Sequence, residues 1–187
     1  TQQTYDSAID ALLEGSLLAV LVVFLFLRDL RATAISALAI PLSAIPTFFF
    51  MQWMGFTLNQ ISLLALSLVA GVLVDDAIVE IENIVRHMRS GKSAWQAALD
   101  AADEIGLAVV ATSATIIAVF LPVSFMGGVT GQFFRQFGLT VAVAVFMSLL
   151  VARLITPLVA AYTLKSHGKV QQGDGPIMTW YLGFLRR

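Results

Sequence analysis

The sequence predicts an all-α fold, a polytopic transmembrane helix bundle with five spans, and three observations support this prediction. Apolar residues make up 58% of the chain and charged residues only 12%, whereas an ordinary soluble domain is about one-quarter charged. The mean hydropathy is +0.86. Five apolar stretches each approach or exceed the roughly 20 residues that a helix needs to cross a bilayer. These stretches cover residues 11–27, 32–54, 58–85, 104–126 and 137–163.

The composition also excludes several kinds of partner and site. A net charge of −1 argues against nucleic acid as a partner. The absence of cysteine excludes disulfides and thiolate metal sites. The two histidines, His87 and His167, lie apart in charged flanking segments, so we expect no histidine metal cluster and no bound metal.

The chain divides into three parts by composition. Residues 1–10 are predicted to end a connection on the outer side of the membrane, residues 11–164 to form the transmembrane domain, and residues 165–187 to form a cytoplasmic linker. The last twelve residues, "PIMTWYLGFLRR", are predicted to form a short amphipathic helix on the membrane surface, with a disordered tail as the alternative. Because the chain starts without Met or a signal peptide, we interpret it as a piece of a longer protein.

Basic residues set the expected orientation, because they are enriched on the cytoplasmic side of membrane proteins. If the five helices alternate in direction, nine of the 11 Lys and Arg residues fall on one side, whereas Arg135 lies opposite and Arg153 lies within the fifth span. The N-terminus is therefore predicted outside and the C-terminus in the cytoplasm. The nine residues are Arg28, Arg31, Arg86, Arg89, Lys92, Lys165, Lys169, Arg186 and Arg187.

Two adjacent aspartates interrupt the third span, in the stretch "AGVLVDDAIVEIEN" at residues 70–83. A charge at the bilayer centre costs about 2.5–3.5 kcal/mol on insertion scales, so intramembrane carboxylates are functional by default. At about 100° per residue, the polar side chains of this helix share one arc, which we expect to face the inside of the bundle. The arc comprises Asp75, Glu82, Arg86, Asn83, Asp76 and Glu80.

The acidic pair has a chemistry suited to proton relay. Two adjacent carboxylates in a low-dielectric site resist double ionisation, so at least one can bind and release a proton near neutral pH. A structural pair neutralised by a cation is an alternative, and Arg153 is the intramembrane cation that this chain offers. A sodium site with carboxylate and backbone ligands is another alternative. An intramembrane aspartyl protease is disfavoured, because neighbours on one helix diverge by about 100°.

Several segments together resemble one family. "GVLVDDAIVEIENIVRHM" resembles the fourth transmembrane helix of resistance-nodulation-division (RND) efflux pumps of the hydrophobe/amphiphile multidrug branch. "FLRDLRATAISALAIPLSAIPTF", "GFTLNQISLLAL", "LPVSFMGGVTGQFFRQFGLTVAVAV" and "RLITPLVAAYTLK" resemble other segments of that membrane domain, in the same order. The resemblance covers nearly all of residues 8–165.

The resemblance implies both architecture and activity. The chain would be helices two to six of the first of two repeats, in a multi-pass pump of the bacterial inner membrane, with residues 1–10 ending a periplasmic connection. The pump would be a homotrimer that works with a periplasmic adaptor and an outer-membrane channel. It would be a proton-driven secondary exporter of drugs and other amphiphiles, not an enzyme, and it would need no cofactor besides protons as coupling ion.

The resemblance also implies roles for single residues. Asp75 and Asp76 match the proton-carrying aspartates, which face a lysine and an arginine of the second repeat. Glu82 and Asn83 match the family's "EN". Glu80 stands where many members have valine, and we interpret it as a polar residue near the cytoplasmic boundary and a candidate for the proton exit path.

Further resemblance covers the connection before the fifth span. Gly127, Gly128 and Gly131 match glycines that permit a tight outer turn. Arg135 is expected at the membrane interface, where it would pair with phosphate or a neighbouring loop. The alternative is that these residues form only a turn followed by a lipid-facing residue that anchors the helix.

Two other functions remain open at this stage. The chain could belong to an RND-type exporter of lipids or metal ions. It could also be a non-transporting membrane sensor or assembly domain of the same architecture, although such a domain has no need of two titratable groups in mid-membrane.

Overall fold

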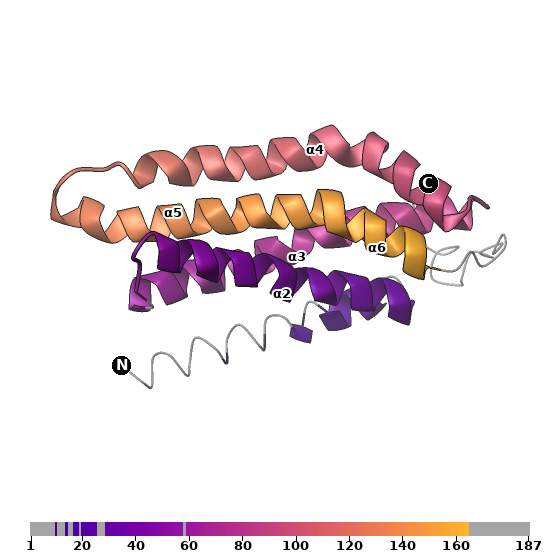
Figure 1. The fold of residues 1–187 in the computed structure, drawn as a ribbon, viewed down its shortest axis with the longest axis horizontal. Coiled ribbons are helices and arrows are strands. Elements are labelled where there is room, and N and C mark those ends of the chain that lie inside the picture. The colour runs from indigo at the N-terminus through magenta and orange to yellow at the C-terminus, as the bar shows by residue number, and fades with distance from the viewer. Residues whose placement is uncertain are drawn as a thin grey trace, which may run out of the picture.

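The computed structural model describes residues 29–57 and 59–164, together with 10, 14, 17, 18 and 20–25. The described part is all helical and contains no strand, which confirms the predicted fold class. The elements are α2 (Leu30–Trp53), α3 (Gln60–Arg89), α4 (Ala94–Val123), α5 (Gly128–Leu150), a π-helical turn η1 (Val151–Ile155) and α6 (Thr156–Thr163). They run side by side along the long axis of the bundle (Figure 1).

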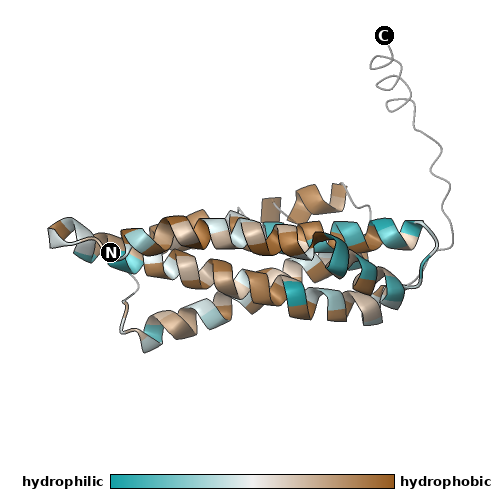
Figure 2. Cartoon of the chain, turned by 90° about the horizontal axis from the view of Figure 1, so that it is seen from above, coloured by the Kyte–Doolittle hydropathy of each residue, from teal (hydrophilic) through white to brown (hydrophobic). Residues whose placement is uncertain are grey.

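Four segments of the described part are long and apolar enough to cross a membrane: α2, α3, α4 and the continuous run α5–η1–α6. At 1.5 Å per residue, the 30 residues of α3 extend about 45 Å, which exceeds the roughly 30 Å hydrocarbon core. Figure 2 shows hydrophobic residues through the middle of the bundle and hydrophilic residues towards its ends. Of the first predicted span, residues 20–25 are helical. Its remainder lies mostly outside the described residues, as do residues 1–9 and the predicted surface helix within 165–187.

Helix α4 begins at Ala94, well before the predicted boundary at residue 104. The polar segment after α3 is helical because Ser93 caps it, its hydroxyl accepting from the Gln96 N–H at 3.3 Å. Its alanines, Ala97 and Ala101 among them, are buried against α3 in one apolar cluster. A helix that is polar on one side and packed on the other therefore carries α4 beyond the membrane core.

Helix α3 is the centre of the fold, because it contacts α2, α4, α5, η1 and α6. Its N-terminal half packs through Ala65, Val69 and Leu73 against α5. Its C-terminal half packs through Ile81 and Ile84 against α2, α4 and α6. The acidic pair lies on α3 between these two apolar clusters.

Glycines let the C-terminal end of α4 and the N-terminal half of α5 approach closely. A Cβ atom at Gly138 would lie 2.3 Å from Ser124 Oγ and 2.6 Å from the Phe120 carbonyl oxygen. A Cβ at Gly131 would lie 1.9 Å from the Met126 carbonyl oxygen. Neither position has room for a side chain, so backbone packing closes this end of the bundle.

We predict that Gly138→Ala lowers the free energy of unfolding by about 1–3 kcal/mol, the usual cost of overpacking a tight contact. The matched control is Gly71→Ala, since a Cβ there meets nothing within 4 Å. Both variants are compared in detergent-solubilised chain by thermal unfolding. Equal unfolding temperatures for the two variants would contradict the close approach of α4 and α5.

Candidate functional site

The predicted polar arc of α3 is divided between two surfaces. One side, with Asp76, Glu80 and Asn83, is buried within the bundle. The other side, with Asp75, Glu82 and Arg86, is exposed in the described part of the chain. Within the described part of the chain, the neighbouring helices therefore cover only one side of the arc, because the arc is wider than the surface that they contact.

Asp76 is enclosed by two serine hydroxyls from neighbouring helices. Its side chain is only 9% exposed. Its Oδ2 lies 3.1 Å from Ser148 Oγ on α5 and 3.4 Å from Ser113 Oγ on α4. Ser148 Oγ also lies 3.2 Å from the Leu73 carbonyl oxygen. Because a hydroxyl has one proton to donate, Ser148 can turn from the carboxylate to this carbonyl when Asp76 is protonated.

Asp75 has the opposite environment. It is exposed, and it has no hydrogen-bond or ion-pair partner among the described residues. It lies in an open stripe of α3, whose members recur every three or four residues and therefore share one side of the helix. The stripe comprises Leu64, Leu68, Gly71, Asp75, Val79, Glu82 and Arg86.

Glu80 pairs with the intramembrane arginine. The fully buried Glu80 accepts a hydrogen bond through Oε2 from Arg153 Nη1 at 3.3 Å. Its other oxygen, Oε1, has no hydrogen-bond partner among the described residues. Glu80 is therefore buried within the bundle. Among the described residues Arg153 pairs with Glu80 and not with the aspartate pair, which was the alternative that the sequence left open.

The position of Arg153 follows from local sequence. It sits in the π-helical turn, which ends two residues before Pro157. Proline has no N–H to donate to the carbonyl of residue 153 and its ring crowds that carbonyl, which disfavours a regular α-helical turn. Gly106 on α4 provides the space for the guanidinium group, because a Cβ there would lie 2.5 Å from Arg153 Nη2.

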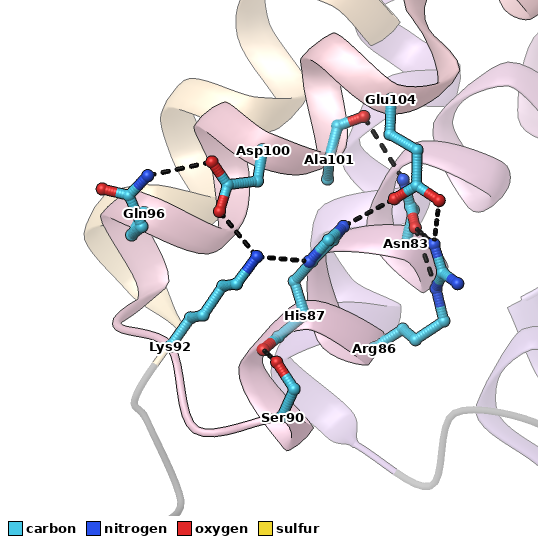
Figure 3. Close-up of polar contacts among 9 residues, drawn as sticks. All are labelled: Asn83, Arg86, His87, Ser90, Lys92, Gln96, Asp100, Ala101 and Glu104. Carbon is cyan, nitrogen blue, oxygen red and sulfur yellow. Dashed lines mark hydrogen bonds and ion pairs between the residues drawn. The ribbon is translucent and has the colours of Figure 1, made fainter.

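A charged cluster joins the C-terminal end of α3 to the N-terminal end of α4 (Figure 3). Arg86 Nη2 lies 2.6 Å from Glu104 Oε1, and His87 Nε2 lies 2.7 Å from Glu104 Oε2. Asn83 Nδ2 donates to the Ala101 carbonyl at 3.2 Å. Asn83 therefore ties the two helices together, and Glu82 beside it points outward.

The turn between these helices is held by a second set of contacts (Figure 3). Lys92 Nζ lies 2.7 Å from Asp100 Oδ2 and 3.1 Å from His87 Nδ1. The hydrogen bonds from Lys92 and then from Gln96 lower the pKa of Asp100, which precedes the apolar span of α4. Its carboxylate therefore remains charged at cellular pH.

The glycine-containing connection after α4 is partly a turn and partly the beginning of α5. Gly127 caps α5, and Gly128 adopts a φ of +80°, a conformation that glycine accommodates without steric cost. Gly131 already lies within α5. Arg135 also lies in α5 and is exposed.

Sequence reasoning missed the residues that surround the acidic side chains. Ser113, Ser148 and Gly106 stand in apolar spans where small residues are common in any helix–helix contact. Their spacing carries a weak signal, because Gly106 and Ser113 are two turns apart on one side of α4. Across the described residues, no group of three or more His, Cys, Asp or Glu side chains is placed to hold a metal ion.

The chain is a helical membrane bundle whose central helix carries two adjacent carboxylates, and comparison with known protein families identifies the class of protein to which it belongs. The sequence profile described as the AcrB/AcrD/AcrF family matches residues 2–187, and the chain belongs to this family of RND multidrug efflux pumps. The described helices and this membership indicate a multi-pass membrane protein.

Particular relatives are also recognisable. The chain is 42% identical to multidrug resistance protein MdtC of Yersinia pseudotuberculosis. It is 44% identical to the proteins of the same name from Pectobacterium atrosepticum and Escherichia coli. Each alignment covers 90% of this chain but only 18% of the relative, so the chain spans about a fifth of the length of the curated relatives it matches.

We predict that Ser148→Ala lowers the free energy of unfolding by about 1.5–3 kcal/mol, the range for a hydrogen bond to a charged group. Ser113→Ala should cost less, because its hydroxyl lies farther from Asp76. Thr115→Ala is the control, since its exposed hydroxyl bonds only to the Ala111 carbonyl of its own helix, and it should change stability by less than about 0.5 kcal/mol. Denaturant titration in detergent measures all three. A Ser148→Ala variant as stable as Thr115→Ala would show that the serine does not support Asp76.

Proposed function

We propose that the chain forms part of the membrane domain of a proton-driven secondary exporter, in which Asp75 and Asp76 carry the coupling proton. The observation that carries this proposal is the contrast within the pair. One carboxylate is enclosed by the chain's own helices, and its neighbour stands on an open surface at the same depth.

The enclosed carboxylate supplies a buried proton site. Asp76 has two hydroxyl partners and no cation within hydrogen-bonding distance among the described residues. Burial disfavours the charged form of a carboxyl group and hydroxyl donors favour it. Such opposing effects allow either protonation state to be populated, as a relay requires.

Asp75, the exposed carboxylate, would couple proton binding to the relative position of the two repeats. Asp75 faces away from the bundle on a stripe with Gly71, and a small residue there lets another helix approach closely. In the family, a lysine and an arginine on helices of the second repeat face these aspartates. Protonation of Asp75 would remove its attraction to such a cation, so the relative position of the two repeats would depend on proton binding.

The wider setting of this proposal rests on family membership. We place the protein in the bacterial inner membrane, with a periplasmic N-terminus and a cytoplasmic C-terminus, as a homotrimer that joins a periplasmic adaptor and an outer-membrane channel. Because the relatives are named multidrug resistance proteins, drugs and other amphiphiles are the proposed substrates. We expect the substrates to bind outside this chain and no catalytic residue or cofactor to be needed.

We predict that Asp75→Asn and Asp76→Asn, made singly in the full-length pump, each abolish efflux while the protein remains folded and inserted. Asparagine keeps the size and much of the hydrogen bonding of aspartate but cannot titrate, so each variant is held in one state. Removing an intramembrane charge should not impair insertion. Drug accumulation in cells is the measurement, with membrane expression and thermal stability determined in parallel.

The control for these variants is Asp103→Asn, which removes an exposed aspartate from the cytoplasmic end of α4. It should pump at the parent rate. If the two variants of the pair were well expressed and also pumped at the parent rate, the pair would be structural.

We predict a second outcome for the 187-residue chain alone. Reconstituted into liposomes, it should show no substrate-dependent proton flux, because the proposed cations and substrate-binding domains lie elsewhere in the pump. A pH-sensitive dye inside the vesicles reports the flux, and the full-length pump serves as the positive control. Coupled flux from the chain alone would show that it needs no second repeat.

A further inference from the structure

We propose that Glu80 and Arg153 form an accessory proton station on the cytoplasmic side of Asp76. In this proposal, which rests on the proposed function, Glu80 takes the coupling proton from Asp76 and passes it to water beside Arg153. The geometry points to this role through three features: the stacking of the two carboxylates, an unpartnered oxygen on Glu80, and a pocket next to Arg153.

The first feature is the register of the two acidic residues on α3. Glu80 follows Asp76 by four residues, one helical turn towards the cytoplasm, and both are buried. Side chains four residues apart stack on the same side of a helix, with Cβ atoms about 5–6 Å apart. A carboxyl group at each position can therefore exchange a proton directly or through one water.

The second feature is the unpartnered oxygen. Arg153 occupies Glu80 Oε2, and Oε1 is buried without a hydrogen-bond partner among the described residues. A buried acceptor without a donor is unfavourable, and a proton arriving from Asp76 supplies what it lacks. The side chain of Arg153 is 25% exposed, so its charge stays partly solvated when Glu80 becomes neutral.

Other charges are remote from this pair. Apart from Asp76 and its neighbour Asp75, the charged group that faces Glu80 is Arg153 of η1. Of the other helices packed against α3, α2 carries charge only at Arg31 in its first turn, α4 only in its first three turns, and α5 only at Arg135 in its outer half. Helix α6 carries none, so Asp76 and Arg153 dominate the electrostatics of Glu80.

The third feature is a route to water. A pocket of about 250 Å³ lies against Arg153. Apolar side chains of α4, η1 and α6 line the rest of it, among them Trp95, Leu99 and Leu158. It extends from Arg153 to the first turn of α4, at the cytoplasmic end of the bundle. At about 30 Å³ per molecule, it has room for several waters.

The proton transfer balances without any further reactant. The O–H bond of the protonated Asp76 breaks, its electron pair stays on Asp76, and a new O–H bond forms at Glu80 Oε1. Glu80 then gives this proton to a water in the pocket and returns to its ion pair with Arg153. No net charge is created between Asp76 and Glu80 in the first step, because one carboxylate replaces another.

The test uses the full-length pump in proteoliposomes and follows substrate-driven proton flux. Glu80→Gln cannot carry the proton, so it should lower the maximal flux several-fold and leave the substrate KM unchanged. Because release to the cytoplasmic side then limits turnover, raising the pH on that side should accelerate this variant more than the parent. Glu80→Asp, which keeps the titratable group, should recover part of the lost flux.

The double variant Glu80→Val with Arg153→Leu separates proton transfer from packing, since apolar replacement of a buried ion pair is often neutral or stabilising. The proposal predicts that this variant folds and remains as slow as Glu80→Gln. Recovery of the parent flux would show that the pair is only structural and would overturn the proposal.

Asp76→Asn is measured beside these variants so that failure of the accessory proton station can be distinguished from failure of the proposed function. If Asp76→Asn is inactive while Glu80→Gln matches the parent in flux and in pH response, the accessory station is wrong and the proposed function stands. If Asp76→Asn pumps at the parent rate, the proposed function itself fails.

Discussion

The burial of Asp76 determines how the neighbouring helices pack against α3, because a carboxylate in the middle of an apolar bundle is unfavourable unless polar groups surround it. Here two hydroxyls do so, from α4 and from α5. Each must reach the same oxygen, and this requirement fixes how both helices are positioned against α3. Close backbone contacts near the turn between α4 and α5, where Gly138 meets the end of α4, hold one end of that arrangement. The charged cluster near the turn between α3 and α4 holds the other end.

Helix α3, helix α4 and the continuous run α5–η1 contact one another at two successive depths. At the level of Asp76, α4 contributes Ser113 and α5 contributes Ser148. One helical turn further along α3, at Glu80, α4 contributes Gly106 and η1 contributes Arg153. Ser148 and Arg153 are five residues apart, and Arg153 lies in a π-helical turn, a conformation whose hydrogen bonds span five residues. Such turns occur often at functional sites. The turn before Pro157 thus aligns the arginine with the serine along one side of the helix.

Much of this architecture could be predicted from the sequence, because the bilayer requires long apolar helices and the backbone requires helical periodicity. The spans of α2 and α3 were predicted to within a few residues, and the polar side chains of α3 were placed on one arc.

The division of that arc could not be predicted, since Asp75 and Asp76 are one residue apart and either could have been the enclosed one. The pairing of Glu80 with Arg153 joins residues 73 positions apart and depends on a glycine in a third helix. The early start of α4 was missed because its polar segment resembles a loop in hydropathy, although alanines at helical spacing mark its packed side.

The accessibility of the two aspartate positions, Asp76 enclosed by this chain and Asp75 open to a partner, can be measured directly. The chain contains no cysteine, so a cysteine placed at either position is its sole thiol. Asp75→Cys and Asp76→Cys are made separately, and the rate of modification by a small maleimide is followed in detergent-solubilised chain, with unfolded protein as the reference for full reactivity. The account predicts fast modification at position 75 and strong protection at position 76. Equal rates at the two positions, or faster modification at position 76, would contradict it.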